Sequence, residues 1–188
     1  KTDYAYYASG NVKSLRNFNG GNLLNNYEYT YDNRGNRTRE TENGDSIKYY
    51  YDALSRISSS ITADGSSQNY SYDDYGNIQS MVQTSPTASG STAISESDYS
   101  YDANNRLTLQ ETANGSSVDQ IRLLYDKEGN QTQKEKVSKQ DGNLVASNTL
   151  SFRYNGYNQL ANVEDSDNNL TVYTYNGTGL RTSKQDVN

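Results

Sequence analysis

Aspartates that precede glycines recur along this chain of 188 residues, and they are the side chains best suited to chemistry. Asp32 stands three positions before Gly35, and Asp73 stands three positions before Gly76. Paired carboxylates can serve as general acid and base in glycoside hydrolysis. The same spacing is typical of a tight turn, in which the carboxylate accepts hydrogen bonds from its own backbone. The fixed position before glycine favours the turn, so we predict that these aspartates are structural.

The segment Glu164–Asn169 is the one candidate for cation binding. Its Asp-x-Asp-x-Asn spacing resembles the start of a calcium loop, which offers carboxylate and amide oxygens at alternate positions. A calcium loop continues with glycine and later a glutamate, whereas Leu170 stands at the glycine position and the glutamate is missing. A solvated hairpin tip is the simpler interpretation, and we predict no metal site.

Several other chemistries are excluded by composition. The sequence contains no histidine and no cysteine, which excludes histidine-dependent nucleophiles, thiolate zinc sites and disulfides. The net charge of −6, with lysine and arginine scattered along the chain, argues against nucleic acid as a partner. Apolar runs are too short to span a bilayer. We therefore predict no catalytic residue, no cofactor, no nucleic-acid partner and no membrane span.

The aspartates are expected to follow strands, because aromatic residues spaced two positions apart stand just before the turns. A tyrosine precedes the turn in eight copies, at intervals of 20–29 residues, and a second aromatic residue stands two positions earlier in seven of them. Residues two apart share one face of a strand. The tyrosines of these pairs are Tyr4, Tyr6, Tyr29, Tyr31, Tyr49, Tyr51, Tyr70, Tyr72, Tyr99, Tyr101, Tyr125, Tyr154, Tyr173 and Tyr175, and the pairs are completed by Leu123 and Phe152.

The turn after each pair starts with a polar residue and, in most copies, ends with glycine. The residues predicted to build it are Asp32, Gly35, Asp52, Asp73, Gly76, Asp102, Asp126, Gly129, Asn155, Asn176 and Gly179. A type I turn with a bulge needs a positive φ at its last position, which glycine adopts easily and asparagine tolerates.

A second set of turns alternates with the first and completes a hairpin repeat. Asn-Gly and Asp-Gly between strand-like segments are strong hairpin signals. The second set comprises Gly20-Gly21, Asn43-Gly44, Asp64-Gly65, Asn114-Gly115, Asp141-Gly142 and Asp167-Asn168. Two turns per repeat predict an all-β antiparallel meander of tandem β-hairpins, with about 14–16 strands of ordinary length. A small closed barrel is the alternative fold. The stretch from Thr84 to Ser91, which contains the single proline, is predicted to be a loop.

Tyrosine is expected to replace the usual aliphatic core. The mean hydropathy is −1.05, and 31% of residues are hydrophobic, including 19 tyrosines and two phenylalanines. A tyrosine ring supplies apolar area while its hydroxyl finds a polar partner. We expect the paired tyrosines to line the buried face of the sheet. Rows of tyrosines can also stack on sugar rings, and Tyr50, Tyr75 and Tyr157, which fall outside the pairs, are the candidates for that role.

The iterated pattern aromatic-x-Tyr-Asp-x-x-Gly-(Asn/Arg)-aliphatic resembles the YD repeats of the Rhs (rearrangement hot spot) family. It is clearest in segments 49–57, 70–78 and 99–107, and the resemblance covers essentially the whole chain. It implies a β-hairpin strip that spirals into a large hollow shell, of which this chain would form an open strip or part-turn. Family members include bacterial polymorphic toxins, wall-associated proteins, the encapsulating components of insecticidal toxin complexes, and teneurins.

The family's Asp-Pro-x-Gly junction and its self-cleaving aspartates have no counterpart here, so the resemblance transfers no catalytic residue. It implies a non-enzymatic segment of a large secreted or cell-surface bacterial protein, whose shell encapsulates or displays a C-terminal toxin that this sequence lacks. We expect residues 1–188 to be a single tandem-repeat segment of a longer chain, with neighbouring repeats and an enclosed toxin domain as partners. A module that binds a cell-surface glycan or protein is the alternative.

Overall fold

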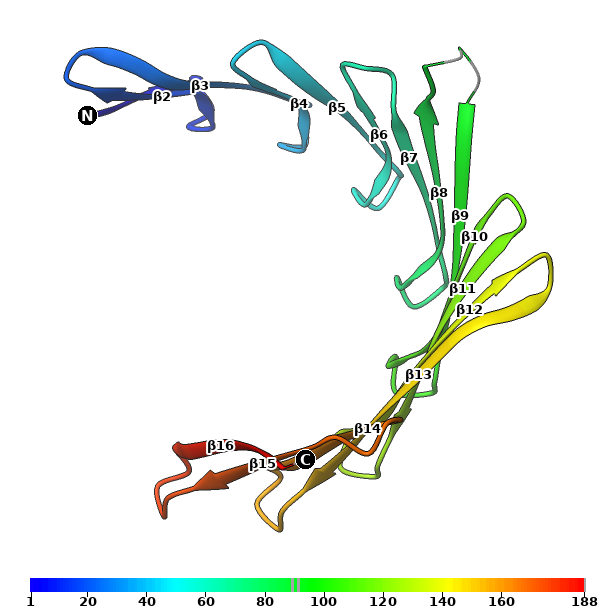
Figure 1. Ribbon diagram of the computed structural model, residues 1–188. Helices are drawn as coiled ribbons and strands as arrows, with labels where there is room; N and C mark the ends of the chain where they lie inside the picture. Colours follow the sequence, from blue (N-terminus) through cyan, green and yellow to red (C-terminus); the bar gives the residue numbers. More distant parts are fainter. Residues whose placement is uncertain (89, 91, 188) are drawn as a thin grey trace. The chain divides into compact units, whose positions relative to one another are not determined.

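The computed structural model describes residues 1–88, 90 and 92–187, and every regular element in them is a β-strand (Figure 1). The strands are β1 (Thr2–Tyr6), β2 (Val12–Asn19), β3 (Asn22–Tyr31), β4 (Arg37–Glu42), β5 (Asp45–Tyr51), β6 (Ile57–Thr62), β7 (Ser67–Tyr72), β8 (Ile78–Pro86), β9 (Thr92–Tyr101), β10 (Leu107–Asn114), β11 (Ser117–Tyr125), β12 (Gln131–Gln140), β13 (Asn143–Tyr154), β14 (Leu160–Asp165), β15 (Leu170–Tyr175) and β16 (Arg181–Val187).

The order of hydrogen-bonded strands follows the sequence from β1 to β16, with antiparallel pairing. The prediction of an all-β antiparallel meander is therefore confirmed. β1 and β16 stand at opposite ends of the strand order, so the alternative of a closed barrel is wrong. The described residues contain no long apolar helix of the kind that crosses a bilayer.

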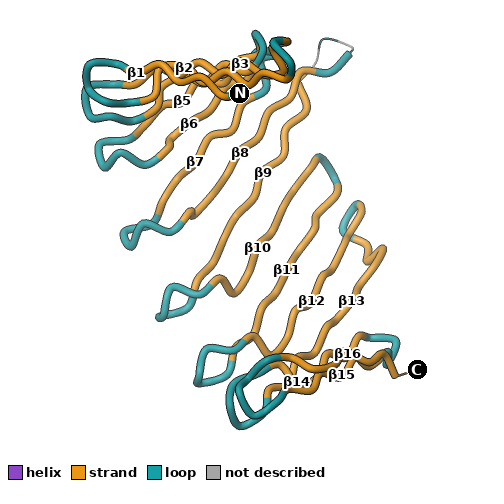
Figure 2. Tube along the Cα trace, turned by 90° about the vertical axis from the view of Figure 1, so that its left-hand side faces the viewer, coloured by secondary structure: helices purple, strands orange, loops and turns teal. Residues whose placement is uncertain are grey.

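By internal contacts the chain divides into two compact units, Lys1–Asp73 with Ser80–Ile94 and Asp74–Gln79 with Ser95–Asn188. In each unit, consecutive strands lie side by side and are joined by turns at alternate ends, as Figure 2 shows. Equivalent turns of successive repeats therefore lie at the same end of their strands. This arrangement brings together residues that are about one repeat apart in sequence.

The turns after the aromatic pairs span five residues. In the turn that begins at Asp32, the Asp32 N–H donates to the Asn36 carbonyl at 2.9 Å and the Gly35 N–H donates to the Asp32 carbonyl at 3.1 Å. Gly35 has a φ of 86°, in the left-handed region that glycine adopts without strain. A bulge follows, because Tyr31 pairs with Arg37 whereas Thr30 pairs with Arg39.

The second set of turns has two forms, of which the sequence indicated only one. Gly20-Gly21, Asn43-Gly44 and Asp141-Gly142 are two-residue turns with positive φ at both positions, as a type I′ turn requires. The predicted turn at Asn114-Gly115 is shifted by one residue, because Asn114 pairs with Ser117.

The other two predicted short turns are wrong. Asp64-Gly65 and Asp167-Asn168 lie inside five-residue turns that begin at Thr62 and Asp165. The Asp165 carboxylate explains the longer turn, since it accepts hydrogen bonds from the N–H groups of Asp167 and Asn169. The predicted loop is also partly wrong, because β8 continues to Pro86. Two residues of that loop prediction, Ser89 and Ser91, lie outside the described residues.

The tyrosine face of the sheet is partly exposed. Residues of the pairs in β3, β5, β7, β9, β13 and β15 are of intermediate exposure, and the residue between each pair is exposed. Among the described residues no hydrophobic side chain is fully buried, and Ser97 alone is buried, at 2% exposure. Because all described elements are strands of the sheet, no other element covers the rings. The tyrosine face, which we expected to be buried, is therefore only half-buried.

Tyr4 and Tyr6 depart furthest from the expected burial, with 53% and 59% of their surface exposed. Their rings stack on each other, with centroids 6.2 Å apart. β1 has a hydrogen-bonded neighbour on one side only, which accounts for the exposure of these rings.

Candidate functional site

The polar residues that open the five-residue turns cap their own backbone. The Asp52 Oδ1 accepts hydrogen bonds from the N–H groups of Leu54 and Arg56, each at 2.9 Å, and the Oδ2 accepts one from the Arg56 Nε at 2.7 Å. Asp32 and Asp102 make the same set of contacts with the residues two and four positions later. Asn155 and Asn176 accept the two backbone bonds through their amide oxygens.

These hydrogen bonds hold the turn aspartates in the ionised form. The side-chain hydrogen bond from Asn36 lowers the pKa of Asp32, and the backbone hydrogen bond from Arg56 lowers the pKa of Asp52. The pKa of Asp126 is lowered mainly by the side-chain hydrogen bond from Asn130. A general acid needs the opposite shift, toward the working pH. The turn aspartates therefore have the electrostatics of structural caps.

In six repeats the tyrosine nearest the turn connects its hairpin to the preceding one. The β4–β5 ladder runs from Arg39 paired with Lys48 to Glu42 paired with Asp45, so Arg37 and Tyr51 lie beyond its end. There the Tyr51 hydroxyl donates to the Arg37 carbonyl at 2.7 Å.

The same bridge recurs in register in other repeats. In each case the acceptor carbonyl belongs to the first strand residue after the preceding turn. The further bridges join Tyr72 to Ile57, Tyr101 to Ile78, Tyr125 to Leu107, Tyr154 to Gln131 and Tyr175 to Leu160, with distances of 2.7 to 3.1 Å. Burial raises the pKa of Tyr51, Tyr72 and Tyr154, which keeps their hydroxyls protonated and able to donate.

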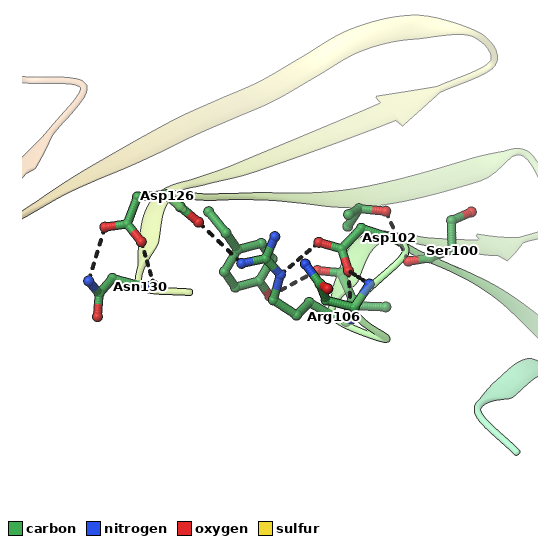
Figure 3. Close-up of polar contacts among 9 residues, drawn as sticks. Ser100, Asp102, Arg106, Asp126 and Asn130 are labelled. Carbon is green, nitrogen blue, oxygen red and sulfur yellow. Dashed lines mark hydrogen bonds and ion pairs between the residues drawn. The ribbon is translucent and has the colours of Figure 1, made fainter. Parts of the chain in front are cut away.

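Arginine adds a second connection where it follows the turn (Figure 3). The Arg106 Nε donates to the Asp102 Oδ2 at 2.7 Å, while its Nη1 donates to the Asp126 carbonyl of the next turn at 3.2 Å. The guanidinium carbon lies 4.7 Å from the centre of the Tyr125 ring, within range of a cation–π contact. Arg56 stacks in the same way on Tyr72, at 4.2 Å.

The structure does not gather the predicted turn residues into a reactive centre. The carboxylates of Asp32, Asp52, Asp102 and Asp126 are each occupied by their own turn. The described residues contain no group of three or more acidic side chains that could hold a metal ion. In the segment considered for calcium, the Asp165 Oδ2 accepts a hydrogen bond from the Asn169 side chain at 2.8 Å. The geometry is that of a structural turn that recurs from repeat to repeat.

A shallow groove of about 550 Å³ lies between the second and third turns. Its lining includes Asp32, Arg34 and Asn36 on one side and Tyr50 and Asp52 on the other. Tyr50 is 49% exposed and lies on the face opposite the paired tyrosines. It is the one aromatic residue that stands between the two members of a pair.

Sequence reasoning missed the residues that connect one repeat to the next. The carbonyl acceptors of the tyrosine bridges carry no side-chain signal, because any residue supplies a backbone carbonyl. The residue directly after the turn did give a signal, since asparagine or arginine recurs there at Asn36, Arg56 and Asn77. Its role in joining neighbouring turns required the structure.

The strand order and the recurring bridges define a tandem β-hairpin repeat protein. No family model matches the sequence, and no curated protein matches it. Solved structures that resemble the chain include the Tc holotoxin pore of Photorhabdus luminescens (12% identity, TM-score 0.42) and the TcdB2-TccC3-Cdc42 complex (14% identity, TM-score 0.41). Each match covers 98% of this chain and 14% of the other, so the chain spans a small part of those proteins.

A porin-like protein from Bacteroides uniformis is also similar, with 12% identity and a TM-score of 0.44 over 98% of this chain and 86% of the other. With TM-scores below 0.5, these similarities carry no inference about function.

Proposed function

We propose that this chain is a non-enzymatic structural segment of a β-hairpin repeat shell in a large secreted or cell-surface bacterial protein. The proposal rests on the resemblance of its repeats to the YD repeats of the Rhs family. In the intact protein, the shell would encapsulate or display a C-terminal toxin domain. Neighbouring repeats are the partners of this segment, and residues 1–188 act as one tandem-repeat unit within the larger chain.

One observation carries the structural role: the groups that could do chemistry are used to hold turns and to join repeats. The Tyr51 hydroxyl is bound to the Arg37 carbonyl, and the Asp52 carboxylate is bound to its own turn. A buried or bound polar group that stabilises structure is a poor candidate for catalysis unless its pKa is shifted toward neutrality. The pKa of Asp52 is shifted the other way.

Protection of the enclosed domain tests the proposal in the full-length protein. We expect the C-terminal domain to resist protease under native conditions and to become cleavable when Tyr51, Tyr72 and Tyr125 are all changed to phenylalanine. Changing the exposed Tyr157 to phenylalanine is the control and should leave protection intact. Encapsulation would be contradicted if the domain were cleaved as rapidly in the wild-type protein as in the triple variant.

A second candidate function, glycan binding, is favoured by the groove beside Tyr50. A volume of about 550 Å³ is within the usual range for small-molecule sites. The exposed ring offers an apolar face, and the Arg34 guanidinium has donors beyond the one used by the Ala53 carbonyl. Asp32 and Asp52 line the groove, so their charges disfavour acidic sugars.

A panel of neutral oligosaccharides tests this second candidate by calorimetry. Binding that is abolished by Tyr50→Ala and preserved in Tyr157→Ala would support the groove. Absence of heat with all of the neutral sugars, or equal loss in both variants, would reject it. This test changes Tyr50, which forms none of the tyrosine bridges, although Tyr51 both forms a bridge and lines the groove.

A further inference from the structure

Neighbouring turns contact each other at two recurring positions, one in each turn. The first is the residue that directly follows the turn, four positions after its opening residue, and we call it the reaching residue. The second is the residue of the next turn that has a positive φ, and we call it the left-handed residue. Together they form the surface by which one repeat meets the next.

Short reaching residues face left-handed residues that carry a polar side chain. The Asn36 Nδ2 donates to the Ser55 Oγ at 3.2 Å, and Ser55 has a φ of 61°. The two other contacts of this kind join Asn77 to Asn105 at 3.1 Å and Asn130 to Asn158 at 3.2 Å, and both acceptors also have positive φ. A non-glycine residue in this conformation is strained, so its side chain must contribute something that glycine lacks.

Long reaching residues face glycine. Arg106 extends past Gly129 to the Asp126 carbonyl, and a Cβ on Gly129 would lie 3.7 Å from the Arg106 Nη1. Gln159 reaches the Gly179 carbonyl at 3.5 Å, and a Cβ on Gly179 would lie 3.2 Å from the Gln159 Nε2, closer than ordinary contact. At Gly179 the missing side chain thus makes room for the long one, whereas at Gly129 a Cβ alone would lie at ordinary van der Waals distance.

From Asn77 onward the two kinds of pair alternate along the chain. In order the pairs are Asn36 with Ser55, Asn77 with Asn105, Arg106 with Gly129, Asn130 with Asn158 and Gln159 with Gly179. The first turn departs from the pattern. Its reaching residue is the short Asn11, whereas the left-handed residue of the next turn is Gly35. That first turn also opens with Tyr7 in place of a capping residue.

We propose that the size match between reaching residue and left-handed residue determines which repeats can be neighbours. A repeat that presents asparagine fits a neighbour with serine or asparagine at the left-handed position. A repeat that presents arginine or glutamine fits a neighbour with glycine. This pairing rule concerns contacts between repeats and holds whether or not the array encloses a toxin domain.

Compensating substitutions in the whole chain test the rule by hydrogen exchange. Arg106→Asn should lower protection of the Asp126 backbone N–H roughly fivefold, because the contact with the next turn is lost. Gly129→Asn should lower it by a similar factor, because Cβ already lies in contact with the Arg106 guanidinium and the amide atoms beyond it need further room. The double variant recreates the asparagine–asparagine pairing, and we expect it to regain most of the protection.

The mirror experiment exchanges the other pair type. Asn130→Arg and Asn158→Gly should each lower protection of the Asn155 backbone N–H, and their combination should restore it. Arg106→Asn combined with Gly179→Asn is the matched control, because these residues do not face each other, and its effects should add. Additive effects in both facing pairs, or compensation in the control as well, would overturn the rule.

Discussion

The Arg37 carbonyl receives its hydrogen bond from the Tyr51 hydroxyl, at 2.7 Å, at a point where β4 and β5 no longer pair. This contact explains the distribution of aromatic residues in the repeat. The position next to the turn is tyrosine in all eight copies, whereas the position two residues earlier also accepts Phe152 and Leu123. The position two residues earlier therefore needs only an apolar side chain, and the position next to the turn needs a ring with a hydroxyl.

Removal of one bridging hydroxyl should therefore destabilise the array. We expect Tyr51→Phe to lower the free energy of unfolding by about 0.5–1.5 kcal/mol, the usual net contribution of one hydrogen bond. Urea titration followed by circular dichroism measures the change. Tyr49→Phe is the control in the same strand, and it should have a smaller effect. An equal loss in both variants would show that the Tyr51 hydroxyl has no special role.

The strands and the hairpin order could be predicted from sequence because both depend on local signals. Alternating tyrosines define a strand face, and Asp32 with Gly35 defines a turn, without reference to distant residues. The degree of burial could not be predicted in the same way. It depends on whether another layer covers the rings, and the repeat pattern around Tyr49 and Tyr51 does not encode that.

Contacts between repeats were less predictable for a related reason. The bridge from Tyr51 to Arg37 depends on how far the β4–β5 ladder extends, which is a property of two hairpins rather than one. The turn at Asp165 shows the same limit, since Asp167-Asn168 suggested a two-residue turn and the Asp165 cap selected a longer one.

The capping role of the turn aspartates predicts a difference between two substitutions at Asp126. Asp126→Ala removes the acceptor for the Asn130 N–H and side chain and should lower the free energy of unfolding, as does loss of a comparable backbone cap. Asp126→Asn should cost less, because Asn155 already accepts the equivalent backbone bonds through its amide oxygen. Urea unfolding of the two variants measures the difference, and equal losses would contradict a capping role.

We predict that position 56 requires arginine and that another positively charged residue cannot replace it. The Arg56 Nε binds the Asp52 Oδ2 while the guanidinium plane lies over Tyr72, and lysine cannot make both contacts. We expect Arg56→Lys to cost about 1 kcal/mol, in the range of a partly exposed cation–π contact. Arg122→Lys is the control, because Arg122 pairs with Glu135 at 3.7 Å on a more exposed surface and should change little. The two variants are compared by thermal unfolding, and similar shifts would refute the prediction.

Acid should destabilise the array through the turn aspartates. Their pKa values are lowered in the folded protein, at Asp32 chiefly by the Asn36 side chain and at Asp102 chiefly by the Arg106 backbone N–H. A carboxyl with a lowered folded-state pKa contributes stability above its unfolded-state pKa, about 3.9 for aspartate, and loses it as the pH falls through the folded-state value.

The unfolding midpoint should therefore be steady above that point and should fall as the pH drops below about 4. Replacement of Asp32, Asp102 and Asp126 by asparagine should flatten this fall, because an amide does not titrate. Thermal unfolding from pH 7 to pH 2 measures both curves. If the triple variant lost stability in acid as steeply as the wild-type chain, other carboxylates would have to carry the pH dependence.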